Sequence, residues 1–155
     1  MGKKMKENKN KLKIADNLNS LEQVETAIIK KKIKKNRILL IENDEDNRFI
    51  IKFILGKYDF EVVSASSGST ALDLVDKSFS IAIINNNIPD IGDTKLFTNL
   101  KSINSNIDLI VISDEYNREI SEDIVIIKKP ISAIKLLSAI ERIFTRKKYT
   151  RHVKI

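Results

Sequence analysis

Short, almost continuous apolar runs recur along the chain from residue 37 onward. They are rich in Ile, Leu and Val, and each is only four or five residues long, which is typical of parallel strands that are buried on both faces. The sequence therefore predicts one parallel sheet made of several short strands. The runs are Ile38–Ile41, Phe60–Ser64, Ile81–Ile84, Leu109–Ile112 and Ile124–Ile127.

Apolar residues at helical spacing lie between these runs. Gly56 follows the first such segment as a helix stop, and Gly68 precedes the second. Alternating strands and helices predict an α/β fold with helices on both faces of the sheet. The helices are marked by Phe49, Ile50, Phe53 and Ile54, then by Ala71, Leu72 and Val75, then by Leu96, Phe97 and Leu100, and last by Ile134, Leu137, Ile140, Ile143 and Phe144.

The connection between the last two strands is at the lower limit of length for a full crossover helix. It comprises residues 113–123, and a complete crossover needs roughly 10–12 residues or more. Tyr116 and Ile120 are its large apolar residues, so we expect the fourth helix to be short or missing. Part of strands 4 and 5 and one flank of the last helix would then be uncovered. We expect a protein partner, a second copy of the chain, or the segment Leu21–Ile33 to cover this face.

The ends of the chain differ from its middle in charge. Residues 1–37 carry 12 Lys and Arg against 4 acids, residues 38–145 carry 11 against 17, and residues 146–155 carry 5 against none. We interpret residues 1–36 as a basic flexible arm, 37–145 as the folded domain and 146–155 as a basic tail. Within the arm, a capping box at Ser20 and Gln23 precedes a possible amphipathic helix over 21–34.

Composition excludes several classes of site. The chain has no cysteine, and its single histidine is His152, so disulfides, thiolate metal sites and a histidine-based catalytic centre are excluded. No apolar run approaches the ~20 residues that cross a bilayer. The start is basic without an apolar stretch behind it, so we expect a cytoplasmic protein.

Polar residues follow four of the predicted strands directly. In open α/β sheets, sites lie beyond the carboxyl ends of the strands, so these side chains should meet at one rim. The segments are Glu42-Asn43-Asp44, Asn85-Asn86-Asn87 with Ile88-Pro89-Asp90 behind it, Ser113, and Lys128-Lys129-Pro130.

Five segments in this order resemble the receiver domain of bacterial response regulators. They are RILLIENDEDNR, FEVVSASSGSTALDLV, IAIINNNIPDIGD, LIVIS and IIKKP, and together they span about residues 37–144. The resemblance implies a CheY-like, flavodoxin-like sheet of five parallel strands in the order 2-1-3-4-5. It also implies two-component signalling by a phosphorelay rather than enzyme catalysis.

The family transfers a phosphoryl group to an aspartate with the help of carboxylate-bound Mg²⁺, a lysine and a Ser or Thr hydroxyl. By the resemblance, Ser113 and Lys129 match the last two roles, and Glu42 matches one of the paired acids. Asn43 replaces the other acid, and Asn85 replaces the phosphoacceptor.

These two asparagines lead us to interpret the site as degenerate. A carboxamide is neutral and is a poor nucleophile, and one carboxylate makes a poor Mg²⁺ site. We therefore expect no cofactor, although a weak residual Mg²⁺ interaction at Glu42 and Asp44 stays open. Lys129 should donate to the Asn85 oxygen or pair with Glu42.

Further departures from the family pattern support the same interpretation. Ile126 stands where the family often has an aromatic residue, and the familiar Asp-Gly appears as Gly92-Asp93. We expect Pro130 to follow a cis peptide bond.

Three functional hypotheses remain open. The first is a pseudo-receiver that signals through protein contacts without phosphorylation. The second is a working response regulator with another acceptor, either Asp44, Asp90 or deamidated Asn85. The third is binding of nucleic acid or another anionic surface through the basic ends, where Tyr149 accompanies the charges of residues 146–152.

Overall fold

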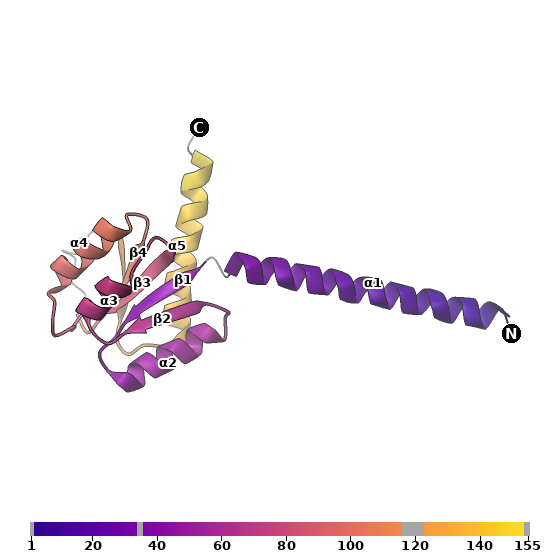
Figure 1. The fold of residues 1–155 in the computed structure, drawn as a ribbon, viewed down its shortest axis with the longest axis horizontal. Helices are drawn as coiled ribbons and strands as arrows, with labels where there is room; N and C mark the ends of the chain where they lie inside the picture. The colour runs from indigo at the N-terminus through magenta and orange to yellow at the C-terminus, as the bar shows by residue number, and fades with distance from the viewer. Residues whose placement is uncertain (1, 34–35, 116–122, 154–155) are drawn as a thin grey trace. The chain divides into compact units, whose positions relative to one another are not determined.

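The chain contains an α/β domain built on one parallel sheet. A computed structural model of the protein describes residues 2–33, 36–115 and 123–153. The sheet has five strands in the order β2-β1-β3-β4-β5, and helices lie around it (Figure 1). This confirms the predicted fold class and strand order. The strands are β1 (Arg37–Ile41), β2 (Glu61–Ala65), β3 (Phe79–Asn85), β4 (Asp108–Ser113) and β5 (Ile124–Lys128), and the helices are α1 (Gly2–Ile33), α2 (Glu45–Gly56), α3 (Gly68–Leu74), α4 (Asp93–Ile103) and α5 (Ala133–Val153).

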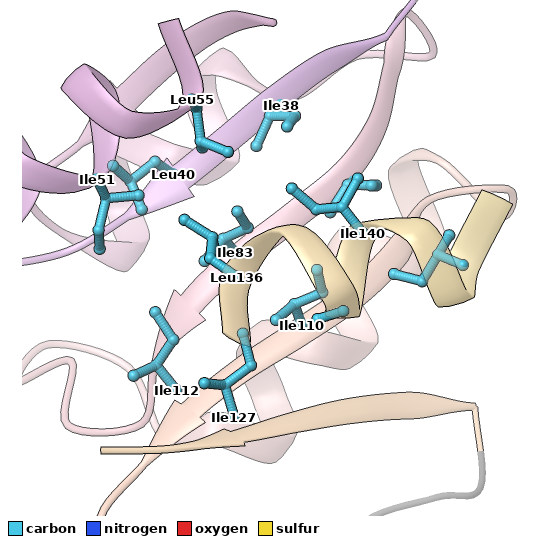
Figure 2. Packing of buried hydrophobic residues seen from close by; sticks show 13 residues of the cluster. Ile38, Leu40, Ile51, Leu55, Ile83, Ile110, Ile112, Ile127, Leu136 and Ile140 are labelled. Atoms are coloured by element: carbon cyan, nitrogen blue, oxygen red, sulfur yellow. The ribbon is translucent and has the colours of Figure 1, made fainter. Parts of the chain in front are cut away.

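The two faces of the sheet carry separate apolar cores. Because successive side chains of a strand point to opposite faces, Ile38 and Leu40 of β1 face one core while Leu39 and Ile41 face the other. Helices α2 and α5 cover the first face, and α3 and α4 cover the second. Figure 2 shows α5 lying across the first face, with Leu136 close to β3. Covering both faces explains why the strands are apolar at nearly every position.

Helix α2 begins at an N-cap and packs by a narrow stripe. The side chain of Asp44 accepts a hydrogen bond from the Asn47 N–H, which satisfies one of the free donors of the first turn. Ile51 and Leu55 are the helix residues fully buried against the sheet. Phe49 and Phe53, which helped to identify the helix in the sequence, are exposed instead.

The N-terminal region is helical from Gly2 to Ile33, whereas the sequence predicted a helix only over 21–34 within the arm of residues 1–36. Helix α1 belongs to a unit of its own, Met1–Lys35, separate from Asn36–Ile155. Lysine, leucine and glutamate favour helices, and the segment has no proline and a glycine only at Gly2. The described side chains of α1, within residues 2–24, are all exposed.

Helix α5 continues to Val153, so most of the predicted basic tail over residues 146–155 is helical. No glycine or proline follows Pro130, so nothing in the sequence stops the helix where the charge changes. Arg146 pairs with Asp108 at the start of β4 at 3.4 Å, and Lys147 lies within ion-pair distance of the same carboxylate. These two charges therefore hold the helix on the domain.

The predicted short or missing fourth helix falls on residues 116–122, which lie outside the described part of the chain. Asp114 and Glu115 form a bend after β4, and Asp123 is in a turn before β5. Within the described ranges, no helix is long and apolar enough to span a membrane.

Candidate functional site

The predicted site residues lie where four parallel strands end. Glu42 follows β1, Asn85 ends β3, Ser113 ends β4, and Lys129 follows β5. Strand β3 lies between β1 and β4, so Asn85 is positioned between the acidic loop after β1 and the hydroxyl of Ser113. The backbone fixes these positions: Glu42 N–H donates to the Ala65 oxygen at 3.0 Å, and Lys129 N–H donates to the Ser113 oxygen at 2.9 Å.

Asn85 and Glu42 form the buried centre of the site. Glu42 is 1% exposed and Asn85 is 6% exposed. Nδ2 of Asn85 donates to Oε1 of Glu42 at 2.9 Å and also to Oδ1 of Asn43 at 3.3 Å. The Asp44 backbone N–H donates to the same Glu42 oxygen at 2.9 Å. The neutral amide thus supplies a donor to a carboxylate that is almost completely removed from water, as a buried charge requires.

The residues present do not fit the Mg²⁺ that the family resemblance implies. Oε2 of Glu42 and Oδ1 of Asn85 are buried without a hydrogen-bond partner, but they amount to one carboxylate oxygen and one neutral amide oxygen. The other Glu42 oxygen already accepts two N–H groups. Mg²⁺ prefers carboxylates in octahedral geometry. Among the residues that the structure describes, no group of three or more His, Cys, Asp or Glu side chains could hold a metal ion.

Asp44 caps the start of α2. Its Oδ1 accepts from the Asn47 N–H at 2.8 Å. Arg48, one residue further along α2, donates to the Glu42 backbone oxygen at 2.9 Å. The loop between β1 and α2 is therefore fixed at both ends by hydrogen bonds.

Asn86 is a site residue that the sequence did not single out. Its Nδ2 donates to Oγ of Ser113 at 2.9 Å, and its backbone N–H donates to the Ile112 oxygen at 3.0 Å. The Ser113 hydroxyl also accepts from the Glu115 N–H at 3.1 Å. The Asn85-Asn86-Asn87 run was the available signal, but strand alternation alone does not tell which of its amides faces β4.

Lys129 has a different partner from the one expected. Its Nζ lies 3.5 Å from Oδ2 of Asp114, an exposed carboxylate directly after Ser113. The expectation that it donates to Asn85 or pairs with Glu42 is wrong, because Asn85 supplies the donor to Glu42 and Asp114 lies at the more solvated rim. The peptide bond between Lys129 and Pro130 is cis, as expected.

Asp90 fixes the loop after β3 to helix α3. Its two carboxylate oxygens accept from the backbone N–H groups of Gly68 and Ser69, each at 2.9 Å. The hydrogen bonds from Ser69 and then Gly68 hold the pKa of the Asp90 carboxyl below its usual value. Gly68 allows a close approach here, because a Cβ at that position would lie 3.0 Å from the Ile91 side chain.

Comparisons with known proteins agree with this architecture. The response regulator receiver domain model matches residues 38–141. No curated protein sequence matches the chain. A receiver domain structure from Clostridium thermocellum shows 25% identity and a TM-score of 0.66, and the match covers 74% of this chain and 98% of that one.

Two further solved structures share the fold at lower identity. A response regulator receiver domain protein from Bacillus halodurans has 20% identity and a TM-score of 0.63, covering 70% of this chain and 96% of that one. The chemotaxis protein CheY4 of Vibrio cholerae has 19% identity and a TM-score of 0.64, covering 70% and 98%. The family match extends over most of the α/β domain and includes every strand described above except the first residue of β1, so this chain belongs to the response regulator receiver domain family of two-component signalling.

Proposed function

We propose that this chain is a pseudo-receiver: it acts in signal transduction through protein contacts and is not phosphorylated at the usual position. The observation that carries the proposal is the hydrogen bond from Asn85 Nδ2 to Glu42 Oε1 at 2.9 Å. It places a neutral donor where phosphoryl transfer requires a nucleophilic carboxylate. A carboxamide nitrogen cannot yield a stable acyl phosphate.

The other site groups support the proposal because each already has a partner within the protein. The Ser113 hydroxyl accepts hydrogen bonds from Asn86 and Glu115. Lys129 is paired with Asp114. A phosphoryl group would have to compete with these contacts. Because the residues present make a poor Mg²⁺ site, little positive charge from a metal ion would be available to offset the negative charge of the phosphoryl group.

A working receiver with another acceptor is the main competing function. Asp44 and Asp90 are the nearby carboxylates, and each caps the N-terminus of a helix. Phosphorylation of either would remove acceptors from backbone N–H groups that need them. These contacts favour the pseudo-receiver over this alternative.

The proposed contact surface is formed by β4, β5 and α5. A groove of about 340 Å³ runs between β5 and α5, and Ile126 and Ile134 are among its lining residues. Ile134 is 79% exposed. An apolar side chain that is open to solvent beside an edge strand suits a protein partner. Arg146 and Lys147 are already paired, which makes a polyanion at this end of α5 the less favoured ligand.

Phosphodonor treatment tests the proposal directly. The full chain is incubated with a small-molecule phosphodonor and Mg²⁺, and its intact mass is recorded at intervals beside an active receiver domain as assay control. We expect no added phosphoryl group. The matched variant carries Asn43→Asp and Asn85→Asp, which restore both carboxylates while Ser113 and Lys129 remain. A phosphorylated residue mapped to the rim of the unaltered chain would overturn the proposal.

A further inference from the structure

Helix α2 has an apolar stripe that faces solvent. Asp46, Phe49, Ile50, Phe53 and Lys57 follow one another at intervals of three, one, three and four residues, so they lie along one face of the helix and its C-cap. We call these five residues the α2 stripe. Phe49 is 70% exposed, Ile50 50% and Phe53 56%.

The stripe is distinct from the side of α2 that packs on the sheet. Ile51 and Leu55 make that contact and are buried. The Phe49 and Phe53 rings stack on each other with centroids 6.4 Å apart, and Lys57 Nζ lies 4.5 Å from the centre of the Phe53 ring. The stripe is therefore a pre-ordered surface, and it uses none of the residues of the degenerate phosphorylation site.

Charge is ordered along the stripe. Asp46 lies at its N-terminal end and Lys57 at its C-terminal end, with the apolar residues between them. In the described part of the chain, neither of these two charged residues forms an ion pair. A helix surface with an acid at one end and a base at the other is complementary to a copy of itself that runs in the opposite direction.

We propose that the α2 stripe binds the α2 stripe of a second copy in an antiparallel, two-fold symmetric arrangement. Taking the midpoint between Phe49 and Phe53 as the axis, each Phe49 comes opposite the partner's Phe53. At about 1.5 Å of rise per residue, Asp46 then lies within about 2 Å, measured along the helix, of the level of the partner's Lys57. The same contact occurs twice, and the antiparallel helix dipoles also favour the arrangement.

The size of the stripe sets the expected strength. Aromatic side chains carry roughly 150–250 Å² each, so the exposed parts of Phe49, Ile50 and Phe53 present on the order of 350 Å² per chain. Two copies with their polar rim approach the lower end of specific interfaces, where contacts are transient. We therefore expect a dimer with a dissociation constant between the micromolar and the millimolar range.

Sedimentation velocity on the full chain, over that concentration range, tests the proposal by charge exchange. Asp46→Lys alone places two lysines opposite two lysines, and Lys57→Asp alone places acids opposite acids. Each single variant should weaken the dimer about tenfold or more, since every change acts twice. An equimolar mixture of the two variants pairs lysines with acids at both contacts, so heterodimers should reappear. Phe53→Ser should weaken the dimer without altering charge.

Two control variants separate this surface from others on the molecule. Asp73→Lys makes the same charge change on exposed α3, on the other face of the sheet, and should leave the dimer unchanged. Ile134→Asp alters the exposed start of α5 and should also leave it unchanged. Circular dichroism confirms that each variant is folded. A monomer at every concentration, a dimer that Asp46→Lys does not weaken, or a dimer that Ile134→Asp abolishes would each overturn the proposal.

Discussion

Replacing Asn85 with aspartate tests whether the hydrogen bond from the amide stabilises the buried Glu42 side chain. The change removes a donor that lies 2.9 Å from Glu42 Oε1 and places a second carboxylate in a site where both residues are at most 6% exposed. Two like charges about 4 Å apart repel by about 4 kcal/mol at an effective dielectric constant of 20. A proton shared by the pair can relieve this repulsion, so burial and the neighbouring carboxylate should raise the pKa of the variant pair above that of an ordinary carboxyl.

That proton limits the loss of stability. Because the shared proton takes up part of the repulsion, Asn85→Asp should lower the free energy of unfolding at neutral pH by about 3–4 kcal/mol. Because the folded-state pKa of the variant is raised, the loss is present above that pKa and decreases as the pH falls toward the unfolded value. Urea unfolding between pH 4 and pH 8 measures the difference from the unaltered chain.

Mg²⁺ provides a second, independent readout on the same variants. A cation bound at one hundred times its dissociation constant adds about 2.7 kcal/mol of stability. We expect Mg²⁺ to restore part of the stability of Asn85→Asp and more of that of the Asn43→Asp, Asn85→Asp pair. Asn47→Asp makes the same change at an exposed position of α2 and should show little loss. A stable Asn85→Asp variant at neutral pH, or equal Mg²⁺ stabilisation of the unaltered chain, would refute the reasoning.

Three further predictions concern other parts of the chain. Leu136→Ala should lower the free energy of unfolding by about 2–5 kcal/mol because Leu136 is completely buried. Phe49→Ala should change it by less than about 0.5 kcal/mol because Phe49 is exposed. Similar losses for the two variants in urea unfolding would contradict the burial assigned to α2 and α5. Asp90→Asn should lower the melting temperature at neutral pH and have a smaller effect in acid. The reason is that the pKa of Asp90 is lowered in the folded state, so this side chain stabilises the fold only while its carboxylate is charged. A difference in melting temperature between the variant and the unaltered chain that stays constant from pH 3 to pH 7 would contradict this. Any binding to polyanions should weaken with salt and disappear when residues 1–35 and 146–155 are removed, and retention by residues 36–145 would place it elsewhere.

The fold could be predicted because the strands are short and apolar at nearly every position, a pattern that is distinctive of strands buried on both faces. Ile81–Ile84 is apolar at every position, as only an element covered on both faces requires, and all five predicted strands are present within one or two residues of their predicted ends. The location of the site follows from the same topology, because the carboxyl ends of parallel strands share one edge.

The side-chain partners at that edge could not be predicted in the same way. Several donors and acceptors lie within reach of one another at this edge. In the structure Asn86 pairs with Ser113, and Lys129 pairs with Asp114. Sequence spacing fixes where each backbone ends but does not rank those choices. The extension of α5 past Thr145 differs from the prediction for a related reason. The predicted boundary rests on a change of charge, and a run of basic residues does not by itself end a helix when no glycine or proline follows.

The contacts at the rim bear on how such a domain could carry a signal. A ligand or modification shifts a conformational equilibrium only through interactions that differ between the two states. In this chain Asn85 already donates to Glu42, Asn86 to Ser113, and Lys129 pairs with Asp114. A phosphoryl group would have to bind these same groups. Its binding would therefore contribute little to the difference in free energy between two conformations of the domain. Under the proposed function, the signal must instead enter through the concentration of a protein partner or of the chain itself. The two surfaces suited to that input, the α2 stripe and the groove between β5 and α5, contain none of the rim residues Glu42, Asn85 and Ser113.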